Sequence, residues 1–176
     1  MRYIWILMLI GSFLQAESFT LASETLKGQM VKAQEFDGFG CNGQNISPEL
    51  HWNHAPKGTK SFAVTVYDPD APTGSGWWHW LIVNIPADTH KLDADASAKK
   101  TLPKGAMETT TDYGHAGFGG ACPPQGDKAH RYVFTVHALD VESLPVKAET
   151  KSAVVGFMIN KHTIQKASMI SYYQRD

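Results

Sequence analysis

Residues 61–72 read SFAVTVYDPDAP, a strand pattern that runs directly into a proline-rich turn. Apolar residues alternate with small or polar ones from Phe62 to Tyr67, which is typical of a β-strand. Asp68 falls on the same face as Phe62, at the point where the strand ends. Because the prolines that follow fix the backbone, the sequence predicts a strand over 61–67 that delivers a carboxylate to a rigid turn.

Further strands are predicted on both sides of this one along the chain. Residues 79–85 are apolar on both faces, which favours a central strand, and 130–139 alternate, with His130 and Tyr132 on one face. Weaker strand patterns lie near residues 18–22, 30–36, 49–52 and 167–173.

One helix is predicted near residue 155, with Thr150 as its N-cap. Its apolar stripe at helical spacing consists of Val154, Val155, Met158 and Ile159. Residues 92–100 are predicted to form a loop or a short surface helix, and the Gly-rich segment 104–128 an ordered loop. Strands dominate and the helix comes late, so we expect a mainly β fold, an antiparallel β-sandwich with peripheral helices.

Length and charge restrict the class of protein. A chain of 176 residues is long enough for one domain with its own core. The formal net charge is −1, which implies no broad basic surface and argues against nucleic acid as a partner.

The N-terminal segment differs from the rest. Arg2 precedes an apolar run that ends near Ala16, a pattern typical of a secretory signal peptide and short for a membrane span. We therefore expect residues 1–16 to be a signal peptide, and 17–176 to form the mature domain in the periplasm or a secreted fraction. An uncleaved anchor is the alternative, because Leu14 is not the small residue that cleavage sites favour.

The chain has two cysteines, Cys41 and Cys122. An even number in an exported chain favours a disulfide, and the spacing matches no zinc-ligand pattern, so we expect no metal there. Two buried free thiols are the alternative.

Two motifs together carry a family resemblance. The first is Asp68-Pro69-Asp70-Ala71-Pro72 followed by Trp77-Trp78-His79-Trp80; the second is Gly119-Gly120-Ala121-Cys122-Pro123-Pro124, which leads into His130-Arg131-Tyr132. Their pairing and order resemble the phosphatidylethanolamine-binding protein family, in particular its bacterial Raf kinase inhibitor-like branch. The resemblance spans about residues 19 to 173 and implies the same β-sandwich fold.

The resemblance also implies a ligand site where the motifs meet. The positions that match the family's anion pocket are Asp68, Asp70, His79, His130 and Tyr132. The positions that match the turns framing it are Pro72, Gly120, Pro123 and Pro124. Arg131, on the opposite face of its strand, is predicted to be a structural ion-pair partner.

The chemistry of these residue types suits a phosphate group. Carboxylates raise the pKa of neighbouring histidines, so we expect His79 and His130 to be imidazolium ions. Charged imidazoles, a tyrosine hydroxyl and loop N–H groups then bind phosphate. Trp77, Trp78 and Trp80 add apolar area beside the pocket.

The expected function is therefore non-enzymatic binding of a phosphorylated small molecule or phospholipid head group, without a cofactor. Two alternatives remain: a protease inhibitor that acts through surface loops, and a hydrolase that uses the aspartates and histidines. The sequence departs from animal members of the family at Trp78, where they often have a second histidine.

Overall fold

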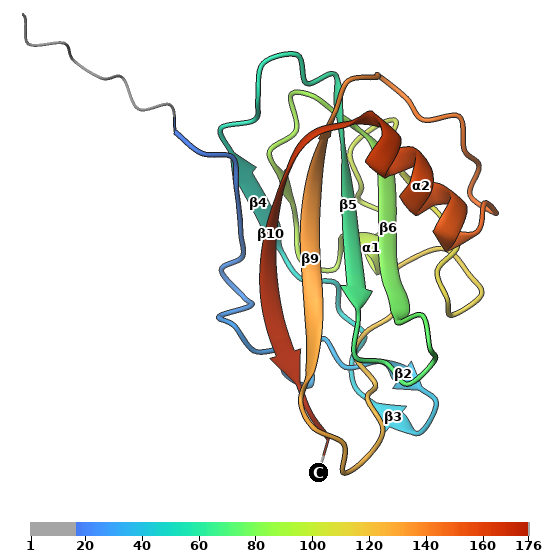
Figure 1. The fold of residues 1–176 in the computed structure, drawn as a ribbon. Helices are drawn as coiled ribbons and strands as arrows, with labels where there is room; N and C mark the ends of the chain where they lie inside the picture. The colour runs from blue at the N-terminus through green and yellow to red at the C-terminus, as the bar shows by residue number, and fades with distance from the viewer. Residues whose placement is uncertain (1–16, 176) are drawn as a thin grey trace, which may run out of the picture.

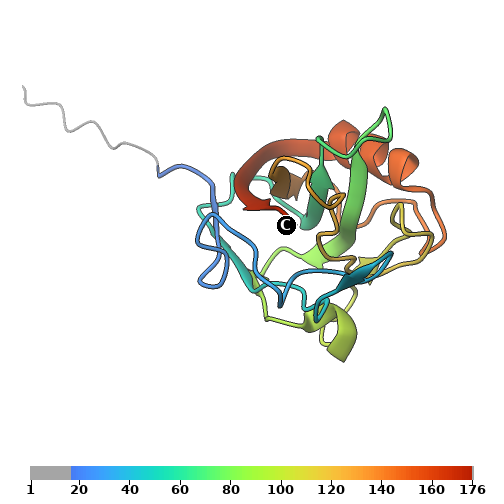
Figure 2. The same cartoon turned by 90° about the horizontal axis from the view of Figure 1, so that it is seen from below.

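The structure, a computed structural model, describes residues 17–175. The predicted signal peptide, residues 1–16, lies outside the described residues. Figure 1 shows the largest sheet with helix α2 beside it, and Figure 2 shows the second layer of strands and loops beneath that sheet. Within the described part, no helix combines the length and apolar character needed to cross a membrane.

The largest sheet has five antiparallel strands in the order β10-β9-β5-β6-β8. Its strands are β5 (Ser61–Asp68), β6 (Trp77–Pro86), β8 (Met107–Glu108), β9 (His130–Leu139) and β10 (Thr163–Tyr173). The three strongest predicted strands are thus confirmed as β5, β6 and β9, which are neighbours. The predicted strand at 167–173 is the second part of β10.

Two smaller sheets complete the antiparallel β fold predicted from the sequence. One has the order β1-β4-β7 and the other pairs β2 with β3. Their strands are β1 (Thr20–Ala22), β2 (Asp37–Gly38), β3 (Cys41–Asn42), β4 (Leu50–Asn53) and β7 (Lys91–Leu92). The predicted strands near 18–22 and 49–52 are therefore confirmed as β1 and β4.

The predicted strand at 30–36 is wrong. The chain turns there, because the N–H of Gln34 donates to the carbonyl of Val31 at 2.9 Å, and only isolated bridges at Gln29 and Glu35 flank the turn. Glu35 is buried because Tyr173, Lys32 and the backbone of Asn42 donate to its carboxylate. Side-chain partners thus replace the strand ladder in this segment.

The helices are α1 (Ala96–Lys99) and α2 (Ser152–His162). Thr150 is not the N-cap of α2, because that position belongs to Lys151 and the Thr150 hydroxyl accepts from the N–H of Lys147 instead. The apolar stripe is also narrower than predicted: Val155 and Ile159 are buried, whereas Val154 is 52% exposed.

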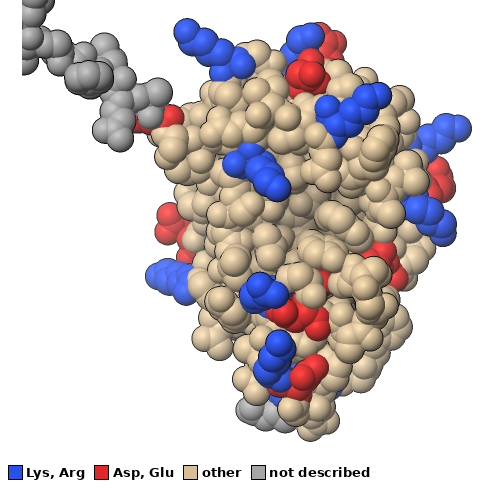
Figure 3. Space-filling view, in the orientation of Figure 1, with Lys and Arg blue, Asp and Glu red and all other residues tan. Residues whose placement is uncertain are grey.

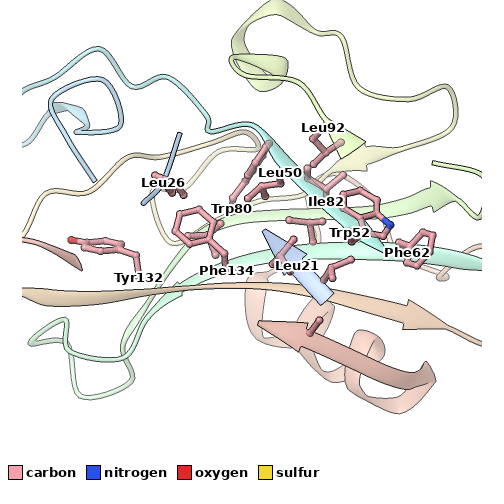
Figure 4. Packing of buried hydrophobic residues seen from close by; sticks show 14 of the residues in the cluster. Leu21, Leu26, Leu50, Trp52, Phe62, Trp80, Ile82, Leu92, Tyr132 and Phe134 are labelled. Carbon is pink, nitrogen blue, oxygen red and sulfur yellow. The ribbon is translucent and has the colours of Figure 1, made fainter. Parts of the chain in front are cut away.

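The main core lies between the five-stranded sheet and the β1-β4-β7 layer. Figure 4 shows Leu50, Trp80, Ile82 and Phe134 packed there, with Phe62 near one end of the row and Tyr132 near the other. A smaller cluster lies between α2 and the opposite face of the sheet. The end marked by Tyr132 is where the strands carry their polar residues.

The surface carries charges of both signs. Figure 3 shows lysine and arginine side chains interspersed with aspartate and glutamate on the face seen in Figure 1, with no continuous basic area. This agrees with the small net charge of −1.

Candidate functional site

A cavity of about 170 Å³ lies where the end of β5, the start of β6 and the start of β9 meet. This volume is below the roughly 300–1,000 Å³ typical of drug-sized ligands, so it suits a head group or a small ion. Its wall consists of Phe39, Asp68, Ala71, Pro72, Thr73, Trp77, His79, Tyr113, Cys122, Pro123, Pro124, His130 and Tyr132.

The structure therefore brings together seven of the nine site residues predicted from the sequence. They are Asp68, Pro72, His79, Pro123, Pro124, His130 and Tyr132. Asp70 and Gly120 do not line the cavity; the first holds the turn after β5, and the second lies behind the wall.

Asp68 ends β5 and organises the turn that follows. One of its carboxylate oxygens accepts the backbone N–H of Asp70 at 2.8 Å, which closes a local Asx-type turn. The other oxygen lies 2.8 Å from Nδ1 of His130 on β9, and both side chains are buried. Asp68 thus joins the ends of two neighbouring strands at the cavity.

His130 lies between two carboxylates. Its Nδ1 faces Asp68, and its Nε2 lies 3.3 Å from Oδ2 of Asp127. Burial alone would lower the pKa of His130, but the hydrogen bonds and charges of Asp68 and Asp127 outweigh burial and raise the pKa above its usual value of 6.5. We therefore assign His130 as an imidazolium ion, as predicted.

His79 behaves in the opposite way. Its Nδ1 donates to the carbonyl oxygens of Gly119 and Gly120, at 2.8 and 3.1 Å. Burial lowers the pKa of His79 despite the nearby charge of Asp68. The prediction of a charged His79 is therefore wrong: the ring is neutral, Nδ1 carries the proton, and Nε2 has a lone pair without a hydrogen-bond partner in residues 17–175.

Tyr132 contributes a hydroxyl to the cavity wall. Its ring edge packs against His79, with centroids 5.0 Å apart. The hydroxyl oxygen is buried, and its proton has no acceptor in the part of the chain described, although the Cys122 backbone N–H approaches the oxygen and slightly lowers its pKa. Burial outweighs this contact and raises the pKa of Tyr132, so that the proton stays on. Buried polar groups are normally paired, so this hydroxyl is a donor available to a ligand.

Asp70 points its carboxylate at Arg131 rather than at the cavity. Oδ2 accepts from the backbone N–H and Nε of Arg131 at 2.9 and 2.8 Å, and Oδ1 accepts from Nη2 at 2.8 Å. These hydrogen bonds hold the pKa of Asp70 well below its usual range. The predicted ion-pair role of Arg131 is confirmed, with Asp70 as its partner.

The segment 118–120 forms the back of the site. A side chain at Gly120 would collide with the carbonyl oxygen of Gln34, so only glycine fits there. The side-chain amide of Asn45 clamps this segment: Oδ1 accepts the N–H of Gly120 at 2.7 Å, and Nδ2 donates to the carbonyl of Phe118 at 3.1 Å.

The predicted disulfide between Cys41 and Cys122 is present, with Cα atoms 6.0 Å apart. It joins β3 to the loop that carries Pro123 and Pro124. Arg175 reinforces the junction by donating to the carbonyl oxygens of Gly40 and Pro123, at 2.8 and 3.2 Å. One wall of the cavity is thus fixed covalently and by hydrogen bonds.

Sequence reasoning missed two aromatic residues of the wall, Phe39 and Tyr113. Tyr113 packs against Trp77 with ring centroids 5.4 Å apart and stacks on Phe39 with centroids 5.7 Å apart, and its hydroxyl donates to Gly120. An aromatic residue in a glycine-rich loop was the only available signal for Tyr113. Phe39, in a turn between two short strands, gave none.

Of the three tryptophans expected beside the pocket, only Trp77 lines it, and its Nε1 is buried without a partner in residues 17–175. Trp78 packs against Tyr67 with centroids 4.7 Å apart. Trp80 lies in the core, where its Nε1 donates to Glu108 at 2.7 Å. Strand alternation separates Trp77 from Trp78. Trp78 and Trp80 separate because the pairing of β6 with β5 shifts register between them, where a bulge re-aims the side chains.

Comparison with known proteins decides the family. A family model described as phosphatidylethanolamine-binding protein matches residues 23–174. The chain belongs to the phosphatidylethanolamine-binding protein family. It is 51% identical over 164 residues to the UPF0098 protein YbcL of Escherichia coli, covering 91% of this chain and 90% of the relative. It is also 51% identical over 139 residues to the UPF0098 protein YbhB of the same organism, covering 78% of this chain and 87% of the relative.

Solved structures of this phosphatidylethanolamine-binding protein family agree. The crystal structure of E. coli YbcL, described as a new member of the mammalian family, superposes with a TM-score of 0.87 at 50% identity, covering 90% of this chain and 99% of that one. A putative homologue from Chlamydia trachomatis gives a TM-score of 0.75 at 27% identity, with 90% and 99% coverage.

Proposed function

We propose that this chain is a non-enzymatic binding protein whose cavity holds a phosphate group, either free, in a small phosphate ester or in a phospholipid head group. The observation that carries the proposal is the buried hydroxyl of Tyr132, whose proton has no acceptor in residues 17–175 and which shares the cavity wall with the free Nε2 of His79. A ligand that satisfies both atoms removes the cost of an unpaired buried group.

The electrostatics restrict the form of the ligand. The charges of Asp68 and His130 offset each other, and no lysine or arginine is among the described residues of the wall. A neutral His79 presents an acceptor, so a phosphate oxygen that still carries its proton can donate to Nε2. Another oxygen of the same group can accept from Tyr132. The monoprotonated form is therefore the preferred one.

The apolar part of the wall suits the remainder of a head group. Trp77 and Tyr113 present aromatic surface, which attracts an ammonium group as well as apolar carbon. The family name refers to phosphatidylethanolamine, whose head group combines a phosphate with an ammonium, and this supports the proposal.

We also propose that the protein acts outside the cytoplasm. Two observations support this location: the signal-peptide pattern of residues 1–16 and the disulfide that fixes the cavity wall. Disulfides persist in oxidising compartments such as the periplasm.

Titration calorimetry with phosphoethanolamine, on protein purified without phosphate, tests the binding function. Tyr132→Phe removes this donor while keeping the aromatic ring, at the cost of the contact between its oxygen and the Cys122 backbone. It should weaken binding about tenfold, the effect of losing a hydrogen bond to a charged group. Tyr172→Phe is the matched control, because Tyr172 lies on the neighbouring strand opposite Arg131 and is exposed. Equal affinities of the two variants and the wild type would refute the proposed site.

A further inference from the structure

Phe39 occupies a turn that disfavours its residue type. In the hairpin of β2 and β3, Gly38 pairs with Cys41, so the loop consists of Phe39 and Gly40. Both have positive φ, 53° and 79°, as in the two-residue turns that favour Asn-Gly. Only residues without a β-carbon, or with a short polar side chain, adopt this conformation readily.

Burial does not compensate for this backbone conformation. The side chain of Phe39 is 73% exposed, although it stacks on Tyr113 with rings inclined by only 22°. Phe39 contacts only Tyr113 and Phe36 among the aromatic residues described, and most of its apolar area stays in water. Strained positions of this kind concentrate at functional sites.

The hairpin presents Phe39 at the cavity in a fixed position. Cys41, two residues away, is bonded to Cys122 in the cavity wall, and the Gly40 carbonyl accepts from Arg175. The ring of Phe39 itself lines the cavity while remaining open to solvent, so it lies at the entrance. Pro72, Thr73 and Pro124 are the other exposed residues of the wall, so a group attached to a phosphate in the cavity can pass beside Phe39 as it leaves.

We propose that Phe39 determines specificity by stacking on the organic substituent of the bound phosphate compound, so that the site prefers phosphate esters with a planar or apolar substituent to inorganic phosphate. Phe39, Tyr113 and Trp77 form a continuous aromatic surface from the entrance inward. The inference rests on the proposed phosphate site, and it assigns the chemical class of the ester.

The test compares phenyl phosphate with inorganic phosphate by titration calorimetry. The wild type should bind phenyl phosphate more tightly, and Phe39→Asn should reduce that preference about two- to tenfold, the range expected for one aromatic stacking contact. Its affinity for inorganic phosphate should change less than its affinity for phenyl phosphate. Phe157→Ala is the control, because Phe157 is 65% exposed on α2, outside the cavity wall.

Phe39→Asn also separates a binding role from a structural one. Because asparagine favours this turn, the variant should have a higher melting temperature than the wild type while it loses the preference for phenyl phosphate. A lower melting temperature, or an unchanged preference, would overturn the inference. If neither compound binds the wild type, the phosphate site itself fails and this inference fails with it.

Sedimentation with vesicles of phosphatidylethanolamine and phosphatidylglycerol identifies the source of the ester. Binding to vesicles that Phe39→Asn weakens would support the inference with a lipid as the ligand. Binding of phenyl phosphate that depends on Phe39, without binding to vesicles, would support it with a soluble ester.

Discussion

The carboxylate of Asp68 and the imidazole of His130 form a buried pair across β5 and β9, with Oδ2 and Nδ1 2.8 Å apart. Both groups lie in the cavity wall, and each is the main partner of the other. A buried pair of this kind contributes little net stability, but the loss of one partner leaves the other charge unpaired. Substitution of either residue should therefore destabilise the fold around the cavity.

Asp68→Asn should destabilise the protein by about 3–5 kcal/mol, because it leaves the His130 ring without its buried counter-charge. It should also lower the pKa of His130, which NMR titration of the ring protons can follow. Asp127→Asn is the control, since Asp127 contacts the same ring but its side chain is 41% exposed. Urea denaturation should show a much smaller effect of the control, and equal effects would contradict a special role for Asp68.

The stability of the protein should fall in mild acid because of His137. This side chain is buried behind Thr65 and Thr163, and burial lowers the pKa of His137 to about 4. In the unfolded chain its pKa returns to about 6.5, so the unfolded state binds more protons between these values. The free energy of unfolding should therefore decrease as pH falls from about 6.5 to about 4, by roughly 3 kcal/mol.

Chemical denaturation at several pH values measures this slope, and His137→Gln should reduce it, leaving the contribution of His79, whose pKa burial also lowers. His115→Gln, at an exposed histidine, should leave the slope unchanged. A variant of His137 with the slope of the wild type would show that another group causes the loss.

Removal of the disulfide should cost the protein about 4 kcal/mol. The bond joins residues 81 positions apart, and closing so long a loop restricts the unfolded chain strongly. Denaturation of the Cys41→Ser/Cys122→Ser variant measures the loss, and the reduced wild type should match it. Thiol titration of the unfolded, unreduced wild type should find no free thiol; two reactive thiols would contradict the bond.

Binding of phosphoethanolamine should weaken as pH rises. The second pKa of a phosphate monoester is about 6, so the form that donates a proton to Nε2 of His79 disappears above it. The monoprotonated fraction falls from about three quarters at about pH 5.5 to about 3% at about pH 7.5, so we expect roughly 25-fold weaker binding at the higher pH. Dimethyl phosphate, which has no second pKa, is the control: a parallel decline would place the titrating proton on a histidine of the wall, His79 or His130, and not on the ligand. Binding of phosphoethanolamine that does not depend on pH would refute the predicted contact.

The sequence predicted the strands that carry the site because their signals are local. Alternating residues in β5 and β9, and the prolines that end β5, define these elements without reference to the rest of the chain. The prediction of a strand at 30–36 was wrong because the carboxylate of Glu35 accepts a hydrogen bond from Tyr173, which lies 138 residues away in sequence. Contacts of that range leave no local pattern.

The same distinction separates the site residues that were predicted correctly from the rest. Asp68, His130 and Tyr132 occupy strand ends, where alternation fixes the direction of the side chain. The direction of Asp70 depends on the turn after β5, and the neutral state of His79 depends on how deeply the fold buries it. Neither the direction of Asp70 nor the protonation state of His79 can be predicted from the neighbouring residues in the sequence.

The amide of Asn45, which clamps Phe118 and Gly120 behind the cavity, affects the choice of expression host. Asn45-Ile46-Ser47 matches the acceptor sequence for N-linked glycosylation. Pro48 follows the acceptor sequence and disfavours its use, but any glycan that a eukaryotic secretory host did attach would join Nδ2, the atom that lies 3.1 Å from the Phe118 carbonyl. A bulky sugar at that atom would displace the segment that accepts from His79, so material for binding studies should come from a bacterial host.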